Sequence, residues 1–457
     1  MRGLAAVSLC LALAGCMVGP DYRRPDTGLP PGFGEAAVAS GATAVPHDWW
    51  KLYGDATLDG LVESGLAHNT DVLAAIARVE EAEAALREAN ATLFFPLVQG
   101  NAGATRSRSI VQGDRVTGNN FALGLSTSFE VDLWGRLRRA ELTTRAQLAA
   151  SVYGRETVSL TVAATIARAY FALRSLDSQV AASESITRAT EESLAIARKR
   201  ADAGIASELD VYQAAGARSA ASAQTKEFRR QRAAIAHQLG VLAGRVDLAF
   251  GTGAIDALPL PPLPPEGLPS TLLERRPDVR QAEALLEAAT QRIGVARGAQ
   301  FPALTLTGSA GLQSGELSSL FNSSAGIWSL GAGLLGPILD GGRYQARTEQ
   351  AEAQAKQAEA QYARAVQNAF RDVADALSNV RLGADTETDL AQHLEETRAA
   401  LRLAGLRYQQ GYSAYIEVLD AQRTLNDAQL AFIRNRQAYL SYTVDLMNAL
   451  GGGWSPR

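Results

Sequence analysis

Two different spacings of apolar residues alternate along the chain. In 121–132 the odd positions are mostly apolar and the even positions are small or polar, and 304–313 and 328–335 repeat this alternation. A fourth segment, 98–105, shows it more weakly. A period of two is typical of a β-strand that has one apolar face. The pattern therefore predicts four strands of about ten residues, which is the length that crosses a bilayer when a strand is tilted.

These four strands are predicted to form two hairpins. Polar, glycine-containing segments at 106–120 and 314–326 separate the members of each pair, and we interpret them as exposed loops. A soluble antiparallel sheet with one wet face alternates in the same way. The polar positions here are very small, however, which suits the inside of a wide, water-filled barrel. Because about eight strands is the smallest common number for a closed barrel, closure would need several chains.

The rest of the sequence predicts unusually long helices. From Leu133 to about Arg200 there is no proline, and from Arg343 to about Gln410 there is again none. About 65 residues at a rise of 1.5 Å make about 100 Å of helix. In 344–380 apolar residues, mostly alanine, recur at the spacing that is typical of coiled-coil packing. A fibrous coiled coil is the alternative, but it would not include hairpins of membrane length.

The sequence contains the same pattern twice, with an offset of about 207 residues. Segment 68–84 parallels 275–291, and segment 200–215 parallels 407–422. This period is far longer than that of a solenoid repeat, so the chain is predicted to be two copies of one structural unit. The proline-rich segment between the copies cannot be a helix or a central strand, and we interpret it as a semi-rigid connector.

The divisions of the chain are predicted from this repeat. Each long helix turns at Gly204 or Gly411 and returns as a second helix, over 208–242 or from Tyr415 to about Leu450. The candidate hinges between helix and strand are Pro96, Gly135, Pro302, Gly341 and Gly342. The predicted divisions are a leader (1–15), an N-terminal anchor and equatorial segment (16–55), a first repeat (56–256, with a β-hairpin at 97–132 and a helical tip near 204), a joint (257–270), a second repeat (271–450, with a β-hairpin at 303–337 and a helical tip near 411) and a C-terminal tail (451–457).

The N-terminus has the form of a bacterial leader sequence. Arg2 precedes an apolar stretch of about a dozen residues, which is the length of a signal-peptide core. The stretch ends in Leu-Ala-Gly-Cys, which resembles the bacterial lipobox, in which the cysteine becomes the lipid-carrying first residue; that cysteine is Cys16. An ordinary signal peptide with a chance cysteine is the alternative. By the same resemblance, Met17 in place of an aspartate favours sorting to the outer membrane.

Charge and composition exclude several other functions. The formal net charge is −4 without a basic block, so nucleic acid is not expected as a partner. The chain has two cysteines, one in the leader and one at the lipobox, so the mature protein has no disulfide. The four histidines are scattered without metal-ligand spacing, and no catalytic motif occurs. An enzyme, a metal site and a cofactor are therefore not expected.

Several long motifs resemble one known family. "FEVDLWGRLRRA" (129–140), "RRPDVRQAEALLEAATQRIGVARGAQFPALTLTGSAG" (275–311), "GPILDGGRYQA" (336–346) and "GYSAYIEVLDAQRTL" (411–425) are similar to the TolC-like outer-membrane factor family. The acylated N-terminus, "CMVGPDYRRP", places the resemblance in the lipoprotein branch of NodT- and OprM-type efflux channels. The resemblance covers essentially the whole mature chain.

This resemblance implies a fold and a function. The fold class is an α+β membrane protein, in which three protomers form a twelve-stranded transmembrane β-barrel and a long periplasmic α-barrel with an equatorial girdle. The function is a passive exit duct for small toxic compounds or drugs, which an inner-membrane pump hands over through a periplasmic adaptor protein. Type I protein secretion is the alternative, and a structural lipoprotein that tethers the membrane is a remote one.

The resemblance also implies a gate at the second turn. Glu417 and Asp420 match the carboxylates that line the family's periplasmic constriction, and at i and i+3 they share a helix face. Three chains would form a carboxylate ring, which attracts cations. Solvated surface residues are the alternative reading of this pair. The other candidate gate residues are Ile416 as an apolar constriction, Arg423 as a partner for Asp420, and Asp210 and Gln213 as the equivalents on the first hairpin.

One departure from the family concerns this gate. Some members have a basic residue shortly before the first carboxylate, where this chain has Ser413 and Ala414. A latch from that position is therefore not expected here.

Overall fold

The computed structural model describes residues 17–26, 28, 30, 45–262 and 275–453. The predicted leader, the lipidation residue Cys16 and most of the predicted joint lie outside the described residues. The chain divides into two compact units, each of which is described by itself. The first unit contains residues 1–27, 78–152 and 281–364, and the second contains 28–77, 153–280 and 365–457.

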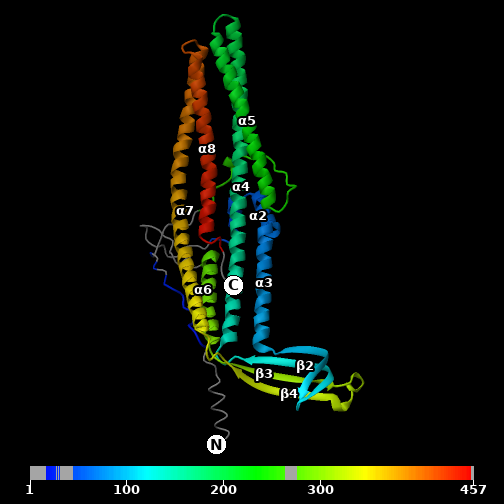
Figure 1. The fold of residues 1–457 in the computed structure, drawn as a ribbon. Coiled ribbons are helices and arrows are strands. Elements are labelled where there is room, and N and C mark those ends of the chain that lie inside the picture. The colour runs from blue at the N-terminus through cyan, green and yellow to red at the C-terminus, as the bar shows by residue number, and fades with distance from the viewer. Residues whose placement is uncertain (1–16, 27, 29, 31–44, 263–274, 454–457) are drawn as a thin grey trace. The chain divides into compact units, whose positions relative to one another are not determined.

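Within the described residues, the strands of the first unit form one four-stranded antiparallel sheet in the order β1-β2-β3-β4 (Figure 1). The central pair, β2 with β3, joins the first repeat to the second. The sheet therefore brings together hairpins that lie far apart in the sequence. The strands are β1 (Leu97–Val111), β2 (Asp114–Val131), β3 (Ala303–Ser314) and β4 (Gly326–Leu335).

The pairing register gives this sheet two unlike faces. Residues directly opposite each other in a sheet share a face, and successive residues alternate between the faces. The side that we call the apolar face includes Val98, Ala102 and Ala104 of β1, Phe121, Leu123, Leu125, Phe129 and Val131 of β2, Leu304, Leu306, Ala310 and Leu312 of β3, and Trp328, Leu330, Ala332 and Leu334 of β4. The opposite side, the polar face, includes Asn101 and Thr105 of β1, Ser126 and Ser128 of β2, Thr305, Thr307 and Ser309 of β3, and Ser329 of β4.

The predicted loop at 106–120 is wrong over most of its length. The ladder between β1 and β2 continues to the pair Val111 and Asp114, so that only two residues form the turn. Gln112 has φ 54° and Gly113 has φ 96°. Positive φ at both central residues defines a tight turn whose twist matches that of the flanking strands, which lets the ladder run to the end of the hairpin. By contrast, 315–325 connects β3 to β4 without a strand.

Helices of the first unit hold the chain that follows the lipobox. They are the later part of α3 (Thr70–Phe94), α6 (Pro277–Gly298) and the first turns of α4 (Arg136–Asp202) and α7 (Arg343–Gln409). The N–H of Val18 donates to the carbonyl of Trp134 at 3.1 Å. The Arg139 guanidinium, which is 2 % exposed, donates to Asp21 at 2.9 Å. Residues close to the lipobox are therefore fixed at the end of α4 that adjoins the strands.

The second unit consists of paired long helices with short helices packed on them. α4 returns as α5 (Glu208–Leu242), and α7 returns as α8 (Tyr415–Ala449), so the two halves repeat the same helical hairpin (Figure 1). The 67-residue length of α4 and of α7 corresponds to about 100 Å. The shorter elements are η1 (Trp49–Tyr53), α2 (Ala56–His68) and η2 (Ile255–Ala257).

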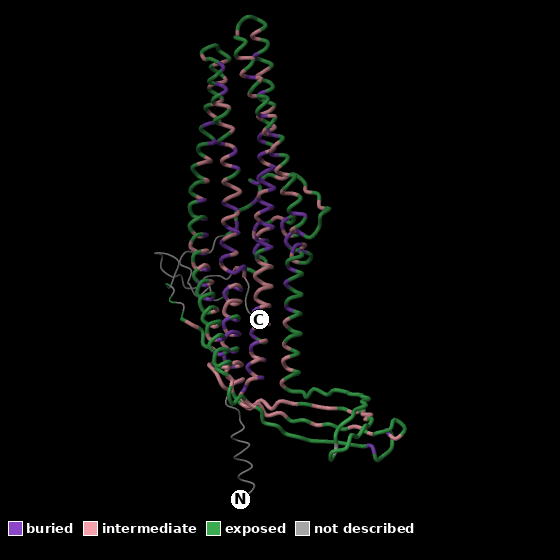
Figure 2. Tube along the Cα trace, in the orientation of Figure 1, coloured by how far each residue is buried: buried purple, intermediate pink, exposed green. Residues whose placement is uncertain are grey.

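The core of the second unit lies where these short elements meet the long helices. Trp49 and Tyr53 of η1 pack with Phe171 of α4, and all three are fully buried. The Tyr53 hydroxyl forms a hydrogen bond of 2.7 Å with the hydroxyl of Thr443 on α8. Figure 2 shows buried residues gathered along the middle of α4, with exposed residues toward the helical tips. No helix in the described ranges has an apolar stretch that is long enough to cross a membrane.

Candidate functional site

The two helical tips in the second unit are built in the same way. Gly204 has φ 72° and Gly411 has φ 77°, the left-handed conformation that glycine adopts at helix ends. The N–H of Ile205 donates to the carbonyl of Arg200 at 2.8 Å, and the N–H of Tyr412 donates to that of Arg407 at 2.9 Å. These bonds over five residues are the helix-ending pattern that a left-handed glycine permits. The sequence repeat at the tips is thus a repeat of backbone geometry.

The first turns of α8 have one packed side and one open side. Tyr415, Val418 and Leu419 are buried in a small cluster with Ala197 of α4 and Ala214 of α5. Between these buried positions, the side chains of α8 at 416, 417 and 420 are exposed. The apolar positions therefore hold the tip together and leave the candidate gate residues free of the protomer's core.

Five of the predicted gate residues line a single groove between α5 and α8, with a volume of about 590 Å³. Asp210 is half-buried and lies outside this lining. The groove residues are Gln213, Gly216, Ala217 and Ala220 of α5, with Ile416, Glu417, Leu419, Asp420 and Arg423 of α8. The small α5 residues leave room beside the carboxylates, so the groove is open, and its charged groups on α8 are two carboxylates and the Arg423 guanidinium.

The ion pair at this tip is not the one that we expected. Arg423 forms no ion pair with Asp420 within the described protomer. Instead, Nε of Arg407 lies 3.7 Å from Oε2 of Glu417, so a basic residue before the turn reaches the first carboxylate. Both side chains are about half-exposed, so the pair contributes only about 0–1 kcal/mol.

Sequence reasoning also missed a contact between the two helical hairpins. The Arg200 guanidinium of α4 lies 4.6 Å from the centre of the Tyr408 ring of α7, and its Nη1 donates to the Tyr408 carbonyl at 3.3 Å. The repeat aligned Arg200 with Arg407, one turn before each glycine, and this was the available signal. The position of Tyr408 beside Arg200 could not be read from the sequence because the two residues are 208 apart.

The candidate hinges lie in the first unit, where helix changes to strand. Gly135 has φ 74°, and Gly341 and Gly342 have φ 63° and 83°. A Cβ on Gly135 would lie 2.7 Å from Cγ of Met17, so the chain after the lipobox leaves no room for a side chain there. Pro302 accepts a hydrogen bond of 2.8 Å from the Trp134 indole. Pro96 directly precedes β1.

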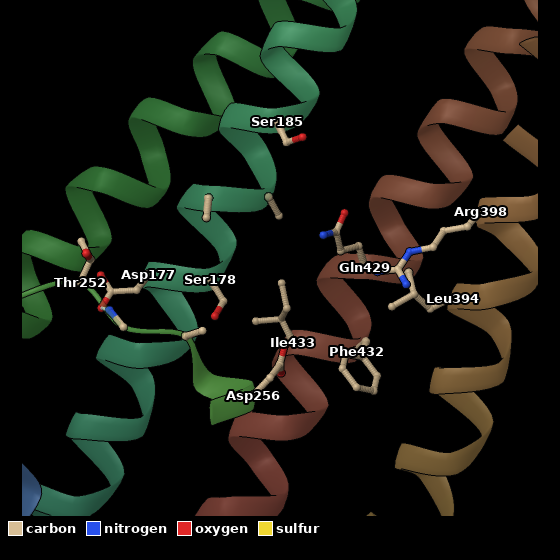
Figure 3. A pocket seen from close by; sticks show the side chains of 14 residues that line it. Asp177, Ser178, Ser185, Thr252, Asp256, Leu394, Arg398, Gln429, Phe432 and Ile433 are labelled. Carbon is tan, nitrogen blue, oxygen red and sulfur yellow. Dashed lines mark hydrogen bonds between the residues drawn. The ribbon is translucent and has the colours of Figure 1, made fainter. Parts of the chain in front are cut away.

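A further cleft of about 540 Å³ lies in the second unit, lined by α4, residues 252–256, α7 and α8 (Figure 3). The carboxylate at its edge, Asp177, is 3 % exposed and fully engaged. It accepts hydrogen bonds from the guanidinium groups of Arg174 and Arg232 and from the N–H of Gly253. Asp177 therefore fixes residues 250–253 against α4.

Metal-ligating groups were not predicted from the sequence. Among the residues that the structure describes, no group of three or more His, Cys, Asp or Glu side chains is placed to hold a metal ion.

This combination of a two-faced sheet and paired helical hairpins matches one protein family. The sequence profile of the family described as "Outer membrane efflux protein" matches residues 61–245 and again 268–452. The chain therefore belongs to the outer membrane efflux protein family, as its motifs suggested, and the double match agrees with the internal repeat.

Curated relatives align along nearly the full length. The solvent efflux pump outer membrane protein SrpC of Pseudomonas putida is 33% identical over 97% of this chain and 97% of the relative. The cation efflux system protein CusC of Escherichia coli O6:H1 is 31% identical over 98% of this chain and 97% of its own.

A solved structure agrees with the fold. The outer-membrane channel OprN superposes with a TM-score of 0.90 at 31% identity, covering 96% of this chain and 100% of that one. The predicted fold class, with its long helical hairpins, four strands and two repeats, is confirmed, and the chain is an outer-membrane efflux protein.

Proposed function

We propose that this chain is the exit duct of a tripartite efflux system, conducting small toxic compounds or drugs through the outer membrane. The observation that carries this proposal is that one chain contains both the two-faced sheet and helices of about 100 Å. A sheet with an apolar side and a small, polar side fits between lipid and water. The helices provide the length to cross a periplasmic space toward a pump and its adaptor. This role is transport and requires no catalysis by the chain.

The duct is proposed to be a homotrimer. Four strands are too few to close a barrel, whereas three copies supply twelve. β1 and β4 are the edges of the sheet, with backbone groups that have no partner strand in the described protomer. Pairing β1 of one protomer with β4 of the next would satisfy these edges. The apolar face would then contact lipid and the polar face would line the water-filled channel.

The lipid anchor is proposed at Cys16. The residues that follow it are bound to the chain where helix meets strand, through Val18 and Arg139. The described residues that directly follow Cys16 therefore lie where helix meets strand, and this end of the first unit would adjoin the inner boundary of the membrane. The lipid would anchor the duct, while the channel itself is built from the strands and helices.

The gate is proposed at the tips, where Glu417 and Asp420 of three protomers would form a ring. The groove residues of α8 would face the channel axis, with Ile416 as the apolar constriction and Gln213 and Asp210 on the first hairpin. Like charges repel in such a ring, and a ring of carboxylates selects cations. The contacts of Arg407 with Glu417 and of Arg200 with Tyr408 would hold the closed arrangement.

Conductance in planar bilayers tests this function. The purified chain is expected to insert as a trimer with a small, cation-selective conductance. The variant with both Glu417→Gln and Asp420→Asn should lose cation selectivity, because it keeps the size of the side chains and removes their charge. The matched control removes two exposed helical carboxylates by the substitutions Glu192→Gln and Asp385→Asn. This control should retain cation selectivity. Folded trimers that do not conduct would refute the duct, and an unchanged selectivity would place the gate elsewhere.

A further inference from the structure

Three arginine side chains lie near the end of the β1–β2 hairpin, in the segment that the sequence suggested was a loop. Arg106 and Arg108 are on β1, and Arg115 is on β2. Arg106 lies opposite Asn119 and Arg108 lies opposite Thr117. Even positions of β1 and odd positions of β2 make up the apolar face, so all three arginines lie on that face.

These arginines form a compact group. Arg106 and Arg108 are two residues apart on one strand, which separates them by about 7 Å. Arg115 is the diagonal neighbour of Arg108 across the ladder, at about 7–8 Å. All three are exposed, and none forms an ion pair in the part of the chain that the structure describes. The adjacent acidic residue, Asp114, occupies an even position of β2 and thus belongs to the polar face.

The position of the group along the strand places it at a membrane boundary. Arg106 is nine residues after Leu97, the first residue of β1, which is about 30 Å along the strand. At a strand tilt of 35–45° this becomes a height of about 21–25 Å, close to the roughly 25 Å of the apolar band of outer-membrane proteins. The continuous run of apolar side chains on this face ends at Ala104 and Phe121, and beyond the first two arginines Ile110 is an isolated apolar residue opposite Arg115. The arginines therefore follow directly where the hydrocarbon layer would end.

This boundary is the outer one. Two residues separate the end of α3 from the start of β1, and the turn at Gln112 and Gly113 lies at the opposite end of the hairpin. If the helices extend into the periplasm, the turn lies on the external side of the membrane.

We propose that Arg106, Arg108 and Arg115 bind the phosphate groups of the lipid that forms the outer leaflet. This inference rests on the proposed function, because it requires the sheet to span the outer membrane.

The chemistry of the group favours lipid phosphate. An arginine guanidinium presents donors in a fixed fork that matches phosphate oxygens, and it is less strongly hydrated than an ammonium group. Arg108 already donates through Nε to the Thr117 hydroxyl at 2.8 Å, which orients its side chain on the strand. The group lies on the lipid side of the sheet rather than on the channel side. Lipid headgroups therefore reach it more directly than the transported compounds do.

Lipid binding by purified trimers in detergent tests the proposal. The probes are lipid A with both phosphates and the same lipid after enzymatic removal of its phosphates, with bound lipid counted by native mass spectrometry. The wild-type trimer should bind the phosphorylated lipid at least about tenfold more tightly. A variant with Arg106→Gln, Arg108→Gln and Arg115→Gln should lose this preference. Equal binding of both lipids by the wild type would overturn the proposal.

Matched variants separate the charge effect from misfolding. A control variant removes three exposed helical arginines by the substitutions Arg87→Gln, Arg188→Gln and Arg381→Gln. This control should keep the preference for the phosphorylated lipid. Replacing the three hairpin arginines by lysine should keep most of it, because the charge remains, even if the glutamine variant does not assemble. Loss of the preference in the helical control would overturn the assignment to the hairpin.

Two further measurements are needed. One distinguishes lipid phosphate from soluble phosphate, and the other distinguishes failure of the lipid site from failure of the proposed duct. Inorganic phosphate at the same phosphate concentration should not displace the lipid, and displacement would identify a site for soluble anions instead. Conductance of the same preparation is measured in parallel. A conducting trimer without lipid preference would refute only the lipid site. A trimer that binds lipid without conducting would refute the duct.

Discussion

The contact between Arg200 and Tyr408 allows a quantitative prediction about the closed state. Tyr408→Leu removes the aromatic face but keeps the backbone carbonyl that accepts from Arg200. A cation–π contact at a partly exposed site contributes about 0.5–1 kcal/mol. If the three protomers open together, the loss is about 1.5–3 kcal/mol per trimer, because the contact occurs once in each. At about 1.4 kcal/mol per factor of ten, the open-to-closed ratio should rise about 10- to 150-fold.

Arg200→Gln should have a larger effect than Tyr408→Leu. It removes both the cation–π contact and the hydrogen bond to the Tyr408 carbonyl, and the latter contributes about a further 0.5–1.5 kcal/mol per protomer. The assay is the open probability of single trimers in planar bilayers.

Tyr408→Phe is the matched control for this series. The Tyr408 hydroxyl has no hydrogen-bond partner among the described residues, so its removal should leave the open probability near that of wild type. Arg198→Gln, an exposed arginine two residues from Arg200, controls for the loss of charge at the tip. Equal open probabilities for Tyr408→Phe and Tyr408→Leu would refute the reasoning, since the aromatic face would then have no role.

The remaining predictions concern stability and sorting. Asp177→Ala should destabilise the protein by about 3–5 kcal/mol, because its two guanidinium partners lose their buried carboxylate, and the midpoint of urea unfolding should fall accordingly. Gly135→Ala should lower the melting temperature more than Gly341→Ala, because both have positive φ but only the first places a Cβ against another residue. Burial raises the pKa of Asp55, but hydrogen bonds from a tyrosine hydroxyl and two backbone N–H groups outweigh burial and lower that pKa. The stability that results is present above about pH 4 and is lost as the pH falls further. Acid should therefore lower the melting temperature of Asp55→Asn less than that of the wild type. Cys16→Ser should reduce the amount of protein in outer-membrane fractions more than it changes conductance, and a normal yield there would contradict the proposed anchor.

Local periodicity was sufficient to predict the main elements of the fold. The alternation in 121–132 and 304–313 predicted strands, and β2 contains 121–131 and β3 contains 304–313. The absence of proline over about 65 residues predicted the long helices, because a helix continues until a residue breaks its hydrogen bonds. The two glycine turns were predicted from the repeat, since a left-handed helix end favours glycine wherever it occurs.

Several features depended on pairing between distant segments and could not be read locally. The length of the β1–β2 ladder was missed because arginine, serine and asparagine dominate 106–120, a composition that resembles a loop. Arg423 was expected to pair with Asp420 because the two are close in sequence, whereas the ion pair at this tip joins Glu417 to Arg407, which is close in space.

The sequence by itself determined the order of the four strands and the long helices and the position of the two glycine turns, because those properties depend on neighbours a few residues away. The tertiary structure decided which face each strand shares with its partners, which put the three hairpin arginines on the apolar face. It also decided which side chains meet at the tips, such as Arg200 with Tyr408. These outcomes depend on register and packing between segments up to about 200 residues apart, and no local pattern encodes them.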